Sequence, residues 1–324
     1  MKYNFDEIIN RKGTNALKTD ALAARYGNAE LIPLWVADMD FKSPPAITEA
    51  IIERAHHGIF GYTCASQEYY NSIINWVNRH HNWQIQQEWI TFIPGIVKGI
   101  AFVLDCFTSK DHQIIIQPPV YHPFRIIPTL HHRIVVDNPL TLEAGQYKMD
   151  LEGLKNIINP ASKVLILCNP HNPGGRVWTR QELIDIAEIC YEHKILVISD
   201  EIHSDLAFAP HKHIPFASVS EKAAQNSITF MAPSKTFNIA GIVSSYSIIP
   251  NDELRKKFNK YLESSELDEG HIFAYLAAQI AYEHCDEWLA QAKDYIWNNI
   301  KLVDEYLKAN IPQIKAMTPE ASFL

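Results

Sequence analysis

The sequence has 324 residues, of which 47% are hydrophobic and 20% are charged. A chain of this size can enclose a cofactor between one large hydrophobic core and a smaller lobe. The formal net charge is −8 at pH 7, and the basic residues form no cluster. Because nucleic acids and anionic membranes attract clustered positive charge, the composition disfavours both as partners.

The cysteines indicate a reducing compartment. There are five of them, scattered and never in C-x-x-C spacing, which argues against a disulfide or zinc framework. The amino-terminal stretch MKYNFDEIINRKG has no continuous apolar segment, and no apolar run in the chain is long enough to span a bilayer. We therefore expect a cytoplasmic protein.

Two further classes of site have no support in the sequence. Histidines occur in adjacent pairs but no H-E-x-x-H motif is present, and adjacent side chains point in different directions on a regular element. We expect no metal site. Neither a Walker A loop nor a G-x-G-x-x-G motif occurs, so nucleotide binding is not indicated.

The first predicted elements in chain order are short β-rich runs between residues 89 and 249 that alternate with segments of helical period. Their alternation predicts an α/β fold with a mostly parallel sheet. Several runs are continuously apolar, as expected for strands that are covered on both faces. The runs are WITFIPG, QIIIQPP, HRIVVDN, SKVLILCNP, ILVISD, NSITFMAPS and GIVSSYSII.

The clearest predicted helix follows Thr179. Thr179 and Glu182 have the spacing of a capping box, and Leu183, Ile186 and Cys190 fall on one helical face. From about Asn251 onward the pattern becomes helical and amphipathic, which suggests a second lobe. The closing residues TPEASFL have the pattern of a loop that enters a strand.

Polar residues follow three of the apolar runs directly. Asn172 follows the run SKVLILCNP. Asp200 is the last residue of ILVISD, and His203 comes three residues later. Ser234 and Lys235 follow ITFMAP. Ligands of an open parallel sheet bind beyond the carboxyl ends of its strands. Alone, the lysine would be read as a solvated loop residue and the aspartate as a helix cap. Together they supply the amine, the anion and the ring-oxygen donor that pyridoxal chemistry needs.

These stretches also carry a family resemblance. The segments PLWVADMDFKSPPAI, GYT, PPVYHPF, CNPHNPGGRVWT, SDEIHSDL and APSKTFNIAGI occur in family order, and weaker similarity continues to PEASFL. The chain resembles the fold-type I pyridoxal-phosphate enzymes, specifically the MalY/PatB carbon–sulfur lyases. The resemblance implies a mostly parallel seven-stranded sheet in a large cofactor-binding domain, residues 46–274. It also implies a smaller α/β domain and amino-terminal arm, residues 1–45 and 275–324.

The resemblance assigns roles around the cofactor. Lys235 corresponds to the lysine that forms the Schiff base with pyridoxal 5'-phosphate, and Asp200 to the partner of the pyridine nitrogen. Asn172 corresponds to the donor to the ring oxygen, and Tyr121 to the aromatic residue that stacks on the ring and assists proton transfer. A carboxylate beside the ring nitrogen favours its charged form and so strengthens the electron sink.

Phosphate binding is expected at the loop Gly95-Ile96-Val97, where a predicted helix begins and free N–H groups favour an anion. Ser234 could add a hydroxyl. Many related enzymes have an arginine a few residues after the lysine, but this chain has Val243-Ser244-Ser245 there.

Three further assignments rest on the resemblance. Tyr62 in GYT resembles the tyrosine that reaches the phosphate of the neighbouring subunit, which implies a homodimer with shared sites; a buried aromatic in a turn is the alternative. Ala37 and Asp38, with Trp35, resemble the segment on the substrate side. His203 lies close enough to Asp200 to tune the cofactor, and a structural hydrogen bond is an equal alternative.

The implied reaction is β-elimination from cystathionine or a cysteine S-conjugate, which gives a thiol, pyruvate and ammonia. Lys235, displaced by the substrate amine, would act as general base on the α-proton. An aminotransferase on the same fold and a shortened cofactor-binding protein without turnover are the alternatives. The family's carboxylate-clamping arginine follows the PEASFL-like motif by several tens of residues. The sequence ends at Leu324, so we expect an incomplete small domain and impaired positioning of substrate.

Overall fold

The centre of the molecule is a seven-stranded sheet whose strands run in the order β1-β9-β8-β7-β6-β2-β3. A computed structural model describes residues 2–324. Strands β1 and β9 are antiparallel to their neighbours, and the other five strands are parallel. The strands are β1 (Ile90–Ile93), β2 (Gln113–Ile116), β3 (Ile134–Asp137), β6 (Ser162–Cys168), β7 (Leu196–Asp200), β8 (Ser227–Met231) and β9 (Ser245–Ile248). Each lies within one predicted run, so the predicted α/β fold with a mostly parallel seven-stranded sheet is confirmed.

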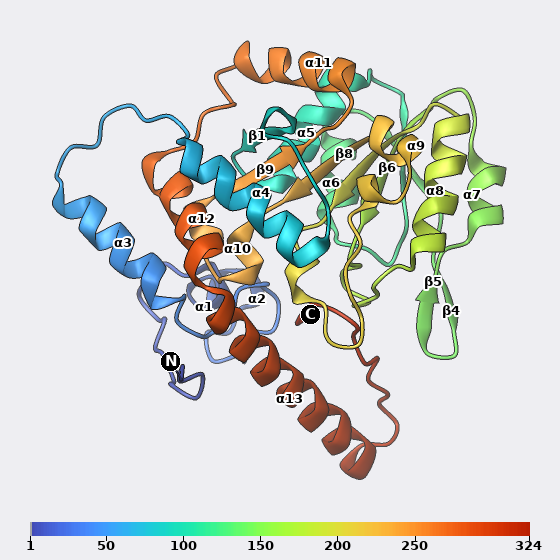
Figure 1. Ribbon diagram of the computed structural model, residues 1–324. Coiled ribbons are helices and arrows are strands. Elements are labelled where there is room, and N and C mark those ends of the chain that lie inside the picture. The colour runs from blue at the N-terminus through green and yellow to red at the C-terminus, as the bar shows by residue number, and fades with distance from the viewer. Residues whose placement is uncertain (1) are drawn as a thin grey trace.

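Helices cover both faces of the sheet (Figure 1). On one face, α5 (Ile96–Phe107), α6 (Pro123–Leu130) and α11 (Asp252–Glu263) form a core with the strands. On the other face, α7 (Leu151–Ile157), α8 (Arg180–Glu192) and α9 (Glu221–Gln225) do so. Alternate strand residues such as Leu165 and Ile166 enter opposite cores. This two-sided burial is the reason why the strand sequences are apolar without interruption.

The predicted helix after Thr179 is α8, and its capping box is present. The Thr179 hydroxyl accepts the backbone N–H of Glu182, and the Glu182 carboxylate accepts the N–H of Thr179 at 2.7 Å. Leu183, Ile186 and Cys190 are buried on the inner face, as their spacing predicts. The two polar contacts satisfy helix N–H groups that would otherwise lack acceptors.

A third core joins the antiparallel edge of the sheet to a group of helices. It contains residues of α4 (Gln67–His81), α12 (Ile272–His284) and the first half of α13 (Asp286–Asn310). Helix α12 packs against α4 and α3 (Pro45–His56). The predicted domain boundary at residue 274 therefore lies inside α12, and the division into two domains stays a prediction.

The remaining elements are short. They are α1 (Leu17–Asp20), α2 (Leu22–Tyr26), α10 (Pro233–Thr236), the hairpin β4 (Thr141–Glu143) with β5 (Gln146–Lys148), and four 3-10 turns η1 (Gln87–Trp89), η2 (Ser204–Leu206), η3 (Phe216–Ser218) and η4 (Ala240–Ile242). In Figure 1, α13 runs away from the sheet, and the chain then returns so that its carboxyl end lies near α10.

The returning segment is fastened to the sheet domain rather than to α13. The backbone N–H groups of Glu320 and Ala321 donate to the carbonyl of Gly175, and the Glu320 carboxylate pairs with Arg176 at 2.7 Å. Ala321 forms an isolated antiparallel bridge with Ala207. The predicted loop is thus present and ends in a single bridge next to η2.

Within residues 2–324, no helix is both long and apolar enough to cross a bilayer.

Candidate active site

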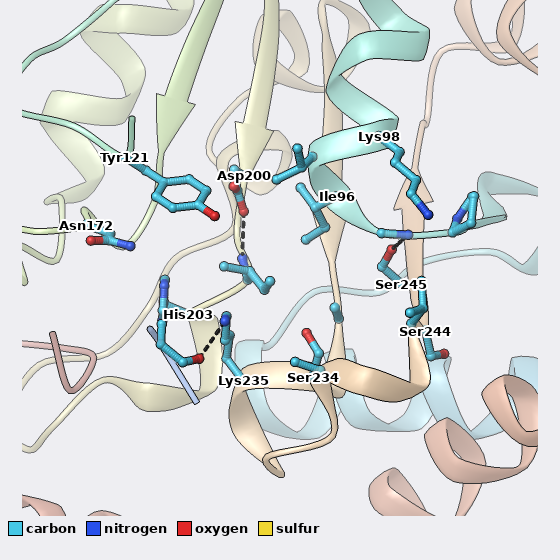
Figure 2. A pocket seen from close by; sticks show the side chains of 18 of the residues that line it. Ile96, Lys98, Tyr121, Asn172, Asp200, His203, Ser234, Lys235, Ser244 and Ser245 are labelled. Carbon is cyan, nitrogen blue, oxygen red and sulfur yellow. Dashed lines mark hydrogen bonds between the residues drawn. The ribbon is translucent and has the colours of Figure 1, made fainter. Parts of the chain in front are cut away.

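A cavity of about 340 Å³ lies beyond the carboxyl ends of β6, β7 and β8, between the start of α5 and helix α10 (Figure 2). This is the position that the topology of an open parallel sheet predicts for a ligand. Most of the predicted site residues line it: Ala37, Gly95, Ile96, Val97, Tyr121, Asn172, Asp200, His203, Ser234 and Lys235. Asp38 and Tyr62 do not.

Lys235 projects into the cavity from α10, the short helix after β8. Its Nζ donates a hydrogen bond to the carbonyl oxygen of Ala37 at 2.6 Å. Burial lowers the pKa of Lys235, and the carboxylates of Asp38 and Asp200 oppose that shift. A lysine with a lowered pKa has a larger fraction of the neutral amine, which is the nucleophilic form.

Asp200 ends β7 and faces the same cavity. One carboxylate oxygen accepts the backbone N–H of Ile202 at 3.1 Å (Figure 2). Burial raises the pKa of Asp200 to about 7, and the Ile202 N–H and the Lys235 cation lower it only in part. A buried carboxyl group in this state would gain strongly from a cationic partner, such as a protonated ring nitrogen.

Tyr121 and Asn172 form the wall opposite α5. The backbone N–H of Tyr121 donates to the Asn172 carbonyl at 3.1 Å, and the N–H of Asn172 donates to the Cys168 thiol at 3.2 Å. The loop that carries Tyr121 and the loop that carries Asn172 are thus hydrogen-bonded to each other. In Figure 2 the Tyr121 ring lies beside Asp200 with its hydroxyl toward the cavity. Burial, with a contribution from Asp200, raises the pKa of Tyr121.

The start of α5 forms the end of the cavity away from Tyr121. Gly95 has φ +105°, a backbone conformation that a side chain would strain, and its N–H donates to the hydroxyl of Ser245 at 3.0 Å. The next three N–H groups, those of Ile96, Val97 and Lys98, have no carbonyl one turn before them in the helix, whereas Gly99 already donates to Gly95. They are therefore available to an anion.

Two residues that the sequence did not single out complete this end. Ser244 lines the cavity and is 2% exposed, yet its Oγ has no hydrogen-bond partner in the described part of the chain, residues 2–324. Lys98, on the first turn of α5, also lines the cavity. A buried hydroxyl without a partner, free helix N–H groups and a lysine form a donor set suited to a phosphate group. Ser234 lies on the same side (Figure 2).

His203 lies three residues beyond Asp200 and lines the cavity. It is buried, and burial lowers its pKa to about 3, with a smaller effect from Lys235. The imidazole is therefore neutral at physiological pH. Its Nδ1 lies 3.2 Å from the hydroxyl of Ser322 in the carboxyl-terminal segment, a contact between residues far apart in the sequence.

Ion pairs hold the segment around Asp38, which the sequence predicts on the substrate side. Arg11 contacts both carboxylate oxygens of Asp38, at 2.7 and 3.2 Å, and Lys18 pairs with Asp40 at 2.8 Å. Trp35 is not a lining residue of the cavity and donates from Nε1 to the carbonyl of Lys18 at 3.1 Å. Arg11 and Lys18 thus fix the backbone next to Ala37, where Lys18 also donates to the carbonyl of Asp38 at 3.0 Å.

Asn238 holds the same segment from the lysine side. Its side-chain amide donates to the carbonyls of Met39 at 3.1 Å and Phe41 at 2.8 Å, and its oxygen accepts the N–H of Met39 at 2.9 Å. Asn238 follows Lys235 by three residues and has φ +57°. Residues 37–41 and the lysine-bearing turn are therefore one unit.

Tyr62 lies outside this cavity and is fully exposed. It belongs to a surface hollow that Phe60, Thr63, Glu269 and His271 also line. The alternative of a buried aromatic residue is wrong for the isolated chain. The predicted reach into a neighbouring subunit stays a prediction. Over residues 2–324 there is no group of three or more side chains placed to hold a metal ion.

The arrangement fits pyridoxal 5'-phosphate. An amine, a buried carboxyl group, an amide and a phosphate-type donor set surround one cavity of suitable size. Fold and site together define the class of the α/β pyridoxal-phosphate enzymes.

Comparisons with known proteins identify the family. Residues 29–324 match the family Aminotransferase class I and II. The chain is 42% identical over 322 residues to cystathionine beta-lyase PatB of Bacillus subtilis, which covers 99% of this chain and 83% of PatB. The chain belongs to the aminotransferase class I and II family, in which it is similar to the MalY/PatB proteins. The predicted family is confirmed.

Solved structures agree with this assignment. Cystalysin from Treponema denticola, whose structure contains pyridoxal 5'-phosphate, matches with a TM-score of 0.96 at 35% identity, over 100% of this chain and 83% of cystalysin. The pyridoxal-phosphate-bound C–S lyase from Staphylococcus hominis matches with a TM-score of 0.91 at 35% identity, over 99% of this chain and 81% of that one.

Proposed function

We propose that this protein is a pyridoxal-phosphate-dependent carbon–sulfur β-lyase that acts on cystathionine or cysteine S-conjugates. The observation that carries the proposal is the convergence of Lys235, Asp200 and Asn172 on one cavity at the carboxyl ends of three neighbouring strands. The similarity to a cystathionine beta-lyase and to C–S lyases supports the choice of reaction.

Each of these residues would bind a different part of the cofactor. Lys235 would hold it covalently, Asp200 would pair with the ring nitrogen, and Asn172 would donate to the ring oxygen. Tyr121 would cover the ring face. Ser234, Ser244 and the N–H groups at the start of α5 would hold the phosphate, and His203 would face the cofactor edge. When bound, pyridoxal phosphate supplies an electron sink for the carbanion formed at the substrate's α-carbon.

Lys235 then serves as the base. Its lowered pKa increases the fraction of free amine that can take the α-proton. The Ala37 carbonyl, 2.6 Å from Nζ, gives that amine a fixed hydrogen-bond acceptor. Residues 37 and 38 would form the substrate side of the cavity, with Asp38 positioned by Arg11. Tyr121 would assist proton transfer from the opposite wall.

We also propose an oligomeric state, a location and a class of partner for the protein. The exposed Tyr62 would reach the phosphate site of a second subunit, so the working unit would be a homodimer with shared sites. The protein would act on a small amino acid in the cytoplasm, with neither nucleic acid nor membrane as partner.

A pyruvate assay tests the proposed reaction. The protein loaded with pyridoxal phosphate should release pyruvate and homocysteine from L-cystathionine, and Lys235→Ala should release neither. An aminotransferase would instead accumulate the pyridoxamine form and respond to an added oxo acid. If the cofactor is bound but neither cystathionine nor a cysteine S-conjugate gives pyruvate, the proposal is wrong.

A further inference from the structure

Ser322 places a buried hydroxyl against His203, a residue that lines the cavity. Ser322 is 1% exposed and His203 is 3% exposed. The Ser322 hydroxyl lies 3.2 Å from His203 Nδ1, and it makes no other hydrogen bond within residues 2–324. The two residues are 119 positions apart in the chain, so this contact exists only because residues 320–322 dock beside η2.

The docking that brings them together is firm. The N–H of Ser322 donates to the Leu206 carbonyl at 2.9 Å, and the N–H of Phe208 donates to the Glu320 carbonyl at 2.8 Å. Phe323 contacts the His203 ring edge-on, with a centroid separation of 6.4 Å. The imidazole is therefore fixed in orientation by a hydrogen bond on one nitrogen and an aromatic contact.

The hydrogen-bond inventory selects one tautomer of His203. If Nδ1 carried the proton, it would donate to Ser322, and the serine hydroxyl hydrogen would be left without an acceptor in a buried position. If Ser322 donates to Nδ1, its hydrogen is satisfied and the histidine proton resides on Nε2. Each tautomer leaves one donor without a partner among residues 2–324, but the Ser322 hydroxyl is buried, whereas an N–H at Nε2 can donate to water or a ligand in the cavity that His203 lines.

The remaining ring nitrogen faces the ligand side. Nε2 makes no hydrogen bond to any described residue, and His203 lines the cavity together with Asp200 and Lys235. A hydrogen on Nε2 also suits a cavity built for an anionic ligand, because a donor there stabilises a negatively charged oxygen.

We propose that Ser322 is a positioning residue that fixes His203 in the Nε2–H tautomer and so presents a neutral hydrogen-bond donor to an anionic oxygen of the cofactor or substrate. The inference rests on the proposed cofactor site but not on turnover. It gives the PEASFL segment, residues 319–324, a function in the site.

Nitrogen-15 NMR of the full chain labelled at histidine tests this inference directly. The two tautomers give different cross-peak patterns between ring nitrogens and ring protons, and His203→Asn identifies the His203 signals. We expect the Nε2–H pattern in the unsubstituted protein, with and without pyridoxal phosphate. An Nδ1–H pattern would overturn the inference, whatever the lyase assay shows.

Variants then test the part played by Ser322. In Ser322→Ala we expect a mixture of tautomers and an affinity for pyridoxal phosphate reduced several-fold. Ser247→Ala removes another buried serine hydroxyl, one on β9 that does not line the cavity, and should leave the His203 signals unchanged. Circular dichroism confirms folding of each variant. If His203 keeps a pure Nε2–H pattern in Ser322→Ala, Ser322 does not fix the tautomer.

Discussion

The amine of Lys235 and the carbonyl of Ala37 are joined by a 2.6 Å hydrogen bond across 198 residues of chain. One belongs to the turn after β8 and the other to an amino-terminal segment without regular structure. The contact holds the reactive amine at a fixed point of the cavity wall. The groups that keep the Ala37 segment in place are therefore expected to influence the chemistry of Lys235.

Asn238 is the first of these groups. Asn238→Gly removes three hydrogen bonds to residues 39 and 41 but tolerates the positive φ at this position. We expect kcat/KM for β-elimination to fall by roughly 10- to 100-fold, because the lysine and its acceptor lose their fixed geometry. Asn226→Gly removes an asparagine bond to the Ile195 carbonyl, far from the cavity, and should reduce stability without that loss. Equal kinetic losses in the two variants would contradict this role.

The ion pair of Arg11 and Asp38 is the second. A double-mutant cycle with Arg11→Met and Asp38→Asn should give a coupling free energy of about 1–3 kcal/mol, because the pair is two-pronged and largely shielded. The matched surface pair, Lys42 and Glu7, should couple by less than about 1 kcal/mol. Urea unfolding measures both cycles. Coupling no larger than in the surface pair would show that Arg11 does not hold the segment.

Asp200 should make stability depend on pH when no cofactor is bound. Burial raises its pKa from 3.8 to about 7, so the folded protein retains a proton that the unfolded chain releases. Stability from this group is present below pH 4 and is lost as pH rises to about 7, by up to roughly 4 kcal/mol. Cofactor-free Asp200→Asn should therefore gain stability relative to the unsubstituted protein between pH 5 and pH 8. Urea unfolding measures the free energy of unfolding of both proteins at pH 5 and pH 8. If the difference between the two proteins is the same at both pH values, the prediction is refuted.

The sequence predicted the parts of the site that lie on regular elements. The ends of the strands can be recognised in the sequence, because apolar runs such as SKVLILC stop at polar residues. Since parallel strands end at the same edge of the sheet, the polar residues that follow them are expected to lie close together. Lys235, Asp200 and Asn172 were found this way. Asn238 and Ser322 could not be, because their partners lie in distant loops whose docking leaves no periodic signal. Asn238 and Ser322 both have a positive φ. Asparagine is enriched in this conformation and serine is not, so only the asparagine gives a sequence signal for it.

Ser244 offers the sharpest test of the phosphate site, because its buried hydroxyl has no hydrogen-bond partner among residues 2–324. An unsatisfied buried hydroxyl is destabilising, so Ser244→Ala should raise the stability of the cofactor-free protein, by about 1 kcal/mol. If the hydroxyl binds phosphate, the same variant should bind pyridoxal 5'-phosphate roughly tenfold more weakly, as expected for a lost charge-assisted hydrogen bond. Its affinity for pyridoxal, which lacks the phosphate, should not change.

The matched control is Ser247→Ala, which removes a similarly buried hydroxyl, also without a partner among residues 2–324, on β9 just after Ser244 but outside the cavity. It should show the gain in stability without the loss of affinity. Fluorescence titration with pyridoxal 5'-phosphate and with pyridoxal measures both affinities for each variant. Weaker binding of both ligands to Ser244→Ala would show that Ser244 shapes the cavity rather than holds the phosphate. Undiminished binding of both would exclude it from the phosphate site, and the cation of Lys98 with the N–H groups of α5 would then be the donors to test next.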